Sequence, residues 1–307
     1  MQPSMTGSAL SFHRVLLATD FSAASQTAFH VALRICAELS ASLSILHVCE
    51  NPYIPSSEPG GQFFELDRIY QTDRIALESL REAAQRAGVP CETNMVNGTP
   101  SLAIMESIAA QNIDLVVLGT NALHGFERLV FGSTAEAILR EALCPVLTVG
   151  PQASESAMAS QLEGPVIFAT DFHRMTLHAI RYAEPFCTAS KSPLHCLHVL
   201  PRALESSSPS RIVPIIMTEA LHHVATETGA TINSPIYAVT YGSEISNAVV
   251  EYAKQHKGKL IVLGVRRASM LASHVPAHIT YRIITEAPCP VLTVSFASEQ
   301  ESAQTAA

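Results

Sequence analysis

The chain has 307 residues, is 48% hydrophobic and carries a net charge of −8 at pH 7. A chain of this length is expected to form two domains of about 150 residues each. Residues 1–150 contain 8 Arg against 15 Asp and Glu, a net charge of −7, which leaves −1 for the remaining residues. Neither half has the positive charge that nucleic-acid-binding domains need, so no nucleic-acid partner is expected.

The seven cysteines are odd in number, scattered and never in a CxxC spacing. This distribution indicates free, buried thiols in a reducing compartment rather than disulfides or a zinc site. The start MQPSMTGSAL lacks the basic residues and apolar run of a signal peptide. No segment approaches the ~20 apolar residues of a membrane span. We therefore expect a soluble, cytoplasmic protein with no membrane partner.

Internal duplication organises the whole chain. Four apolar blocks of the first half return in the second: VLLATDF (15–21) as VIFATDF (166–172), LSILHV (43–48) as LHCLHV (194–199), DLVVLG (114–119) as KLIVLG (259–264), and CPVLTV (144–149) as CPVLTV (289–294). The distance from Gly119 to Cys144 is 25 residues, and so is the distance from Gly264 to Cys289. Spacing that is kept so closely indicates two copies of one domain.

The elements of the first half alternate in type along the chain. The repeated blocks are short, β-branched and almost entirely apolar, as in parallel strands that are covered on both faces. Residues 22–40 and 65–88 have apolar residues at intervals of three and four, which predicts helices, the second ending at Gly88. Another helix is predicted to begin at Thr99-Pro100. Each half therefore predicts the order β-α-β-α-β-α-β-α-β, a doubly wound sheet of five parallel strands.

We expect a first domain over residues 1–150 and a second over residues 165–296. Between them, residues 151–164 are small and polar and predict a linker. Residues 297–307 predict a disordered tail.

Ligands of open parallel sheets bind beyond the carboxyl ends of the strands, where the winding direction reverses. Three first-half segments follow strands in this way: Asp20, residues 48–50 and residues 119–134. The Asp20 carboxylate suits hydrogen bonding to sugar hydroxyls or to the edge of a base. The alternative is that Asp20 caps the first helix together with Ser22.

The segment after the fourth strand reads Gly119, two residues, Ala122, nine residues, and then Gly132, Ser133 and Thr134. Glycines let the backbone approach phosphates closely, and the start of a helix attracts anions. The alternative is that Ser133 and Glu136 form a capping box that serves only the helix. The segment is not a P-loop, because the first 150 residues contain no lysine. The GxGxxG fingerprint of dinucleotide-binding domains is also missing after the first strand.

Metal binding and catalysis have little support in the sequence. His195-x-x-His198 is the closest approach to ligand spacing, but residues three apart on a strand face opposite ways, so no metal site is expected. No Ser-His-Asp or Cys-His signature is present, and no catalytic residue is assigned. Cys144 and Cys289 each precede a strand-entry proline, where a small buried residue is a sufficient explanation.

Three features together resemble a tandem universal stress protein over most of the chain, from about Phe12 to Phe296. They are the aspartate after the first strand, the LHV that closes the second strand, and the G-x2-G-x9-G-[ST] loop pattern followed by CPVLTV. The resemblance implies an adenine nucleotide alpha hydrolase-like fold and ATP as the ligand, with or without Mg²⁺. It also implies that the apolar last strands pair with each other as an intramolecular pseudo-dimer, and it leaves further homodimerisation open.

The resemblance implies nucleotide-binding roles for these residues: Thr19 and Asp20 on the ribose and adenine side, Val48 at the adenine through its backbone, and Gly119, Gly132, Ser133 and Thr134 at the phosphates. Ala122 stands where the family has its second loop glycine. If this position needs positive φ, alanine costs on the order of 1 kcal/mol, which weakens binding without forbidding it.

The second half departs from the pattern. The counterparts of Ala122, Gly132, Ser133 and Thr134 are Arg267, Ala277, His278 and Ile279, and Pro276 removes a further N–H. We therefore expect a regulatory stress-response protein that binds ATP in its first domain and uses its second as a structural partner. The alternatives are a nucleotide-free scaffold of the same fold and a weak ATPase, for which the sequence offers no lysine and no positioned general base.

Overall fold

The computed structural model describes residues 10–50, 61–120, 132–153, 164–205, 212–230, 234–266 and 276–296. The first half contains β1 (Arg14–Thr19), α1 (Ala23–Leu39), β2 (Ser42–Cys49), α2 (Gly61–Arg86), β3 (Cys91–Asn97), α3 (Pro100–Ala110), β4 (Leu115–Gly119), α4 (Ser133–Glu141) and β5 (Val146–Val149), followed by the 3-10 turn η1 (Pro151–Ala153). The second half contains β6 (Val166–Ala169), η2 (Thr176–Ala183), α6 (Glu184–Ser190), β7 (Leu194–Pro201), η3 (Arg202–Leu204), α7 (Ile212–Glu227), β8 (Ile236–Gly242), α8 (Ile245–Gln255), β9 (Leu260–Arg266), α10 (Pro276–Glu286) and β10 (Val291–Phe296).

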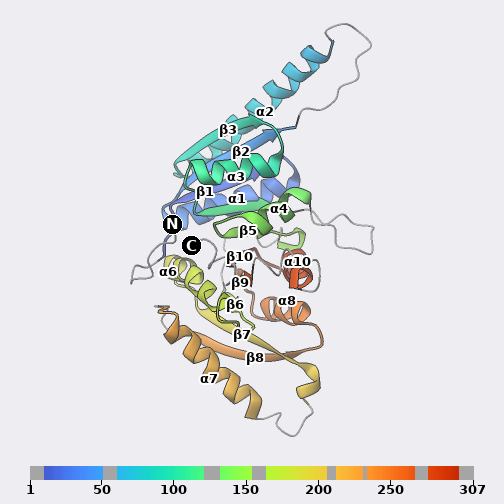
Figure 1. Cartoon of the computed structure of the whole chain (residues 1–307). Helices are drawn as coiled ribbons and strands as arrows, with labels where there is room; N and C mark the ends of the chain where they lie inside the picture. Colours follow the sequence, from blue (N-terminus) through green and yellow to red (C-terminus); the bar gives the residue numbers. More distant parts are fainter. Residues whose placement is uncertain are drawn as a thin grey trace, which may run out of the picture.

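The strands form one ten-stranded sheet in the order β3-β2-β1-β4-β5-β10-β9-β6-β7-β8 (Figure 1). Within each half the five strands are parallel. The winding direction reverses between β1 and β4 in the first half and between β6 and β9 in the second. The predicted pair of doubly wound parallel sheets is confirmed.

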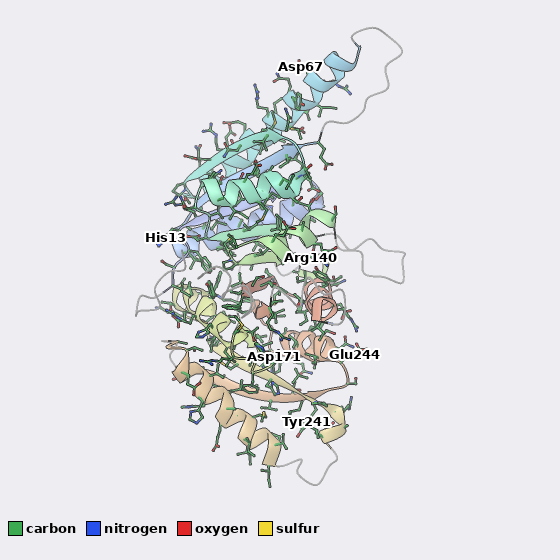
Figure 2. All side chains as sticks on the ribbon, in the orientation of Figure 1. His13, Asp67, Arg140, Asp171, Tyr241 and Glu244 are labelled. Carbon is green, nitrogen blue, oxygen red and sulfur yellow. The ribbon has the colours of Figure 1, made fainter. Side chains whose placement is uncertain are left out.

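The two halves meet at β5 and β10, which pair antiparallel with Leu147 opposite Leu292. The last strands therefore pair with each other inside a single chain, as the family resemblance implies. A side-chain contact adds to the junction, because Ser295 Oγ donates to the Leu139 carbonyl at 3.4 Å. Figure 2 shows Arg140, the next residue of α4, at this junction.

Helices cover both faces of the sheet, and each buried core runs through both halves. On one face α1, α2, η2, α6 and α7 pack over strand residues that include Leu17, Leu147 and Leu292. On the other face α3, α4, α8 and α10 pack over residues that include Leu16 and Val291. The same continuous layers therefore stabilise both halves, and each leucine or valine fully buried in them contributes about 1.5–3 kcal/mol.

Two predicted helix boundaries have the expected local structure. Gly88 has a φ of 75° just after α2, and the N–H of Val89 bonds the carbonyl of Ala84 at 3.0 Å. This is the left-handed helix ending for which glycine is preferred. Thr99 precedes α3 in an extended conformation with proline at the helix start, although its side chain makes no capping hydrogen bond.

The counterpart of α1 in the second half differs from the expected helix. A 3-10 helix, η2, leads directly into the short α6, and Pro185 lies in the first turn of α6. Proline has no N–H to donate and its ring disturbs the preceding turn, so a continuous α-helix cannot pass through it. The second half therefore covers this face with two short helices.

The predicted linker begins with η1, whose Ala153 is buried. The rest of the linker, residues 154–163, and the predicted tail, residues 297–307, lie outside the described residues. In the part of the chain that the structure describes, none of the helices combines the length and apolar character required for a membrane span.

Thr148 and Thr293 occupy equivalent positions of the two CPVLTV strands, and their exposed fractions are 0% and 1%. Neither hydroxyl has a hydrogen-bond partner within the described residues. A buried hydroxyl without a partner costs about 1–3 kcal/mol, so Thr148→Val and Thr293→Val should each raise the free energy of unfolding, by about 1 kcal/mol. Urea denaturation of the full chain measures this, with the exposed Thr188→Val as the control. Loss of stability in both strand variants would contradict it.

Candidate functional site

The carboxyl ends of three neighbouring strands meet at the point where the winding reverses. Thr19 ends β1 and pairs with His47 of β2, while Gly119 ends β4 on the other side of β1. Val48 lies beside His47, near the end of β2. Because β4 and β5 are parallel, α4 must run back between them and begin at this same edge of the sheet. The topology therefore brings the described candidate residues to one edge.

Asp20 organises the turn that joins β1 to α1. Its Oδ1 accepts the N–H of Ser22 at 3.0 Å, and Thr19 Oγ1 accepts the N–H of Phe21 at 3.1 Å. Phe21 has a left-handed φ of 59°, and Ser22 is the N-cap of α1, accepting from the N–H of Ser25. The alternative interpretation is thus correct in part: Ser22 caps the helix, and Asp20 holds the turn before it.

The Asp20 carboxylate is ionised at neutral pH. Partial burial raises the pKa of Asp20, but hydrogen bonds from Ser22 and Ser25 outweigh it, so the pKa lies below its ordinary value. A lowered folded-state pKa means that the carboxylate stabilises the fold at neutral pH and that this contribution is lost as the pH falls through that pKa. The exposed carboxylate can also accept hydrogen bonds from hydroxyl groups of a ligand.

The second half repeats this turn. Asp171 Oδ1 accepts the N–H of His173 at 3.0 Å, and Phe172 has a φ of 61°. In both halves the phenylalanine ring packs on a histidine of the neighbouring strand. The ring centroids are 4.4 Å apart for Phe21 and His47 and 4.5 Å apart for Phe172 and His198. A retained aspartate is therefore explained by the turn and does not indicate a second ligand site.

Sequence reasoning missed the histidines as fixed parts of this edge. Nδ1 of His47 lies 2.8 Å from the carbonyl oxygen of Thr19, and Nδ1 of His198 lies 2.8 Å from that of Thr170. The signal was available, because the repeated blocks contain both ATDF and LHV. The pair His195-x-x-His198 behaves as predicted: His195 turns to Tyr252 at 2.9 Å, away from His198.

Gly119 and Gly264 have a packing role that needs no ligand. A Cβ on Gly119 would lie 2.3 Å from the carbonyl oxygen of Ala24, and one on Gly264 would lie 2.3 Å from that of Thr176. These distances are far shorter than a van der Waals contact, so any side chain would displace the segment that follows the first strand of each half. The glycine is kept in both halves because both sheets need this close approach.

Gly132 lacks the packing constraint of Gly119 and Gly264, although glycine is a favoured N-cap residue. Its φ of −62° is open to any residue, and a Cβ there would meet no heavy atom within 4 Å in the structure as described. It is the N-cap of α4, with Ser133 as the first helical residue and no side-chain capping bond, so the capping-box interpretation of Ser133 is wrong. Glu136 instead pairs with Arg140 at 3.2 Å.

The start of α4 can hold an anion. The first N–H groups of a helix have no partner within the helix, and the helix dipole favours negative charge there. Ser133 is exposed and Thr134 is half-buried, and both belong to the first turn. Ala122, the predicted departure in the loop, lies outside the described residues.

The second half has a different surface at the equivalent place. The helix α10 already begins at Pro276, so Ala277 belongs to its first turn rather than to a loop before it. Ile279 and Thr280 line a cavity of about 260 Å³ whose other walls include Asp171 and Gly264. Ile279, the counterpart of Thr134, thus lines this cavity with an apolar side chain. Figure 2 labels Asp171 within this half.

The cysteines are poor candidates for catalysis. All seven lie in the described ranges and are unpaired. Burial raises the pKa of Cys144 and of Cys289 to about 12. Thiols with such pKa values stay protonated at neutral pH and are weak nucleophiles.

Comparison with known proteins identifies the class. The model of the universal stress protein family matches residues 11–150 and again residues 164–295. The chain therefore belongs to the universal stress protein family and contains two universal stress protein domains in tandem.

Individual relatives match one half at a time. The universal stress protein MJ0531 of Methanocaldococcus jannaschii is 30% identical over 139 residues, 45% of this chain and 82% of that protein. The putative universal stress protein SH1215 of Staphylococcus haemolyticus is 34% identical over 143 residues, 46% of this chain and 86% of that protein. A universal stress protein structure from Archaeoglobus fulgidus matches the fold of both halves, with a TM-score of 0.69 at 18% identity, over 92% of this chain and 98% of that chain.

The stability of the fold should respond differently to an added methyl group at Gly119 and at Gly132. Gly119→Ala should lower the free energy of unfolding by about 1–3 kcal/mol or more, because the Cβ overlaps the backbone of Ala24. Gly132→Ala should lower it by about 1 kcal/mol or less, the cost of replacing glycine by alanine at a helix N-cap. Urea denaturation of the two variants without added ligand tests the assignment. Equal loss of stability in both would show that Gly132 also serves the fold.

Proposed function

We propose that the protein binds an adenine nucleotide, ATP in the first instance, in its first half, and acts in a cytoplasmic stress response as a nucleotide-dependent regulator. The observation that supports the proposal most strongly is Gly132. Its φ does not require glycine, and within the described residues no heavy atom lies within 4 Å of a Cβ placed there, yet it stands directly before a helix start that can receive an anion. A phosphate that approaches the backbone closely would account for the missing side chain.

The proposed roles follow from where the residues lie. Gly132, Ser133 and Thr134 would bind the phosphates through N–H and hydroxyl groups at the start of α4. Asp20, ionised at the neighbouring edge, would accept from the ribose hydroxyls, with Thr19 beside it. Val48 would contact the adenine through its backbone, and Gly119 would contribute mainly by keeping α1 close to β4.

Charge balance bears on the phosphates. The first 150 residues contain no lysine and have a net charge of −7. Phosphate charge would therefore be compensated by backbone N–H groups, by the helix dipole and by a divalent cation such as Mg²⁺ that arrives with the nucleotide. Mg²⁺ would neutralise part of the phosphate charge, and the Ser133 and Thr134 hydroxyls are oxygen ligands of the kind it accepts. No hydrolytic step is included, because the loop groups bind phosphates without activating water.

In this proposal residues 1–150 form the nucleotide-binding domain, and residues 165–296 form its structural partner. The antiparallel pairing of β10 with β5 supports this division of roles. In the second half Ala277, His278 and Ile279 stand in place of Gly132, Ser133 and Thr134. The unpaired state of all seven cysteines supports a reducing compartment.

Isothermal titration of the full chain with Mg-ATP tests the proposal. We expect one site per chain, lost in the double variant Gly132→Val with Ser133→Ala, because a branched side chain fills the space that the phosphates need. The matched control changes the second half at the same positions, Ala277→Val with His278→Ala, and should bind as the wild type does. Absence of binding heat with the wild type, or equal heat with the first double variant, would refute the proposal.

A nucleotide-free scaffold is the second candidate, and two observations favour it. The hydrogen bonds of Asp20 within the turn are sufficient to explain an aspartate at this position. The close approach of Ala24 is sufficient to explain a glycine at position 119, and neither explanation needs a ligand. Mass spectrometry of the protein as purified separates the two functions. A nucleotide present at close to one per chain would exclude the scaffold, whereas a ligand-free protein that also fails to bind added Mg-ATP would support it.

A further inference from the structure

Three potential metal ligands gather under the turn between β1 and α1. His47 and Cys49 are two residues apart on β2 and therefore point to the same face of the sheet, where α2 brings Asp73 against them. The ligand atoms of the three side chains all lie within 4.8 Å of one another. Among the described residues this is the one such group of histidine, cysteine or acidic side chains.

We propose that His47, Cys49 and Asp73 bind a transition-metal dication, with Zn²⁺ as the best match. An imidazole nitrogen, a thiolate sulfur and a carboxylate oxygen are all ligands that Zn²⁺ accepts, and three protein ligands leave a fourth position for water. The sulfur ligand disfavours Mg²⁺ and Ca²⁺, which prefer oxygen. The proposed ion is therefore different from a Mg²⁺ ion that would accompany the phosphates of a nucleotide.

One of the distances between ligand atoms suits a tetrahedral ion. Bonds of about 2.0–2.3 Å at tetrahedral angles separate neighbouring ligand atoms by roughly 3.4–3.6 Å. His47 Nε2 and Asp73 Oδ2 are 3.4 Å apart. A direct charge-assisted hydrogen bond between them would bring the atoms to about 2.7–2.9 Å. The separation of this pair is therefore compatible with two ligands of one ion.

The imidazole is held in the orientation that a metal ligand needs. His47 Nδ1 lies 2.8 Å from the carbonyl oxygen of Thr19, to which it donates, so Nε2 is the ring nitrogen that faces Asp73. A second ring N–H donated to a carbonyl is the usual support of a metal-binding histidine. The ring of Phe21 packs on the imidazole, with the two ring centroids 4.4 Å apart, and restrains the orientation of the imidazole ring.

Burial favours binding and leaves a route of entry. The exposed fractions of His47 and Cys49 are 9% and 6%, so competing water is largely excluded from the nitrogen and the sulfur. The side chain of Asp73 is 18% exposed and forms the solvent side of the group. On binding, the sulfur–metal bond replaces the S–H bond of Cys49, and the proton is released to solvent.

Comparison with the second half shows which of these features belong to the fold and which belong only to the proposed metal site. His198 makes the same 2.8 Å contact with a backbone carbonyl, and Phe172 packs on it in the same way. The counterpart of Cys49 is Leu200, which has no ligand atom. The histidine is thus common to both halves as a part of the fold, whereas the thiol occurs only in the first.

Titration of the metal-free full chain with Co²⁺ and then Zn²⁺, without nucleotide, tests the proposal. We expect one Co²⁺ per chain with the visible spectrum of a tetrahedral ion and a thiolate-to-cobalt charge-transfer band, and displacement by Zn²⁺. Cys49→Ser should remove the charge-transfer band. Asp73→Asn, which keeps the shape of the side chain, should weaken binding about tenfold or more, since even supporting residues of metal sites contribute that much. His198→Gln is the control in the second half and should leave the Co²⁺ stoichiometry and the charge-transfer band unchanged.

A stability measurement covers the case in which a variant folds poorly. Zn²⁺ should raise the Tm of the wild type and of His198→Gln but not that of Cys49→Ser. The proposal is overturned if the wild type binds no stoichiometric Co²⁺ or Zn²⁺, if bound Co²⁺ is octahedral without a thiolate band, or if Cys49→Ser keeps the band. Because no nucleotide is present, none of these outcomes depends on the nucleotide site.

Discussion

The antiparallel pairing of β5 with β10 is the interaction on which the rest of the structure depends. Through it two five-stranded sheets become one ten-stranded sheet, with Leu147 opposite Leu292 at the junction. Each half would otherwise expose an apolar edge strand, which is an aggregation hazard in water. The pairing also lets both helical layers run across the junction, so each buried core layer is shared by the two halves. Both copies of the frame must therefore persist, whatever either one binds.

The same constraint separates residues that serve the frame from residues that are free to serve a ligand. Gly119 and Gly264 permit a backbone approach that each sheet needs, and Asp20 and Asp171 hold equivalent turns. These residues occur in both halves. Gly132 and Cys49 occur only in the first, where their counterparts are Ala277 and Leu200. Asymmetry between the halves, more than the presence of a family motif, points to ligand binding.

The duplication and the strand blocks could be predicted from the sequence, because apolar β-branched runs and their spacing depend on local chemistry. The pairing of the last strands was expected only from the family resemblance. Pro185 was visible in the sequence, but how the chain accommodates it as η2 and α6 depends on packing. The role of Gly119 rests on an approach by Ala24 that is distant along the chain, and the grouping of Asp73 with His47 depends on how α2 lies across β2. Such contacts between separate elements have no local signature.

Hydrogen exchange of the full chain with and without Mg-ATP tests the central claim most directly, since it reads both halves in one experiment. The amides at the start of a helix lack intrahelical partners and exchange readily unless a ligand binds them. We predict that ATP slows exchange in peptides that contain Gly132, Ser133 and Thr134, and leaves those that contain Ala277, His278 and Ile279 unchanged. Equal protection of both helix starts, or protection of neither, would contradict the account.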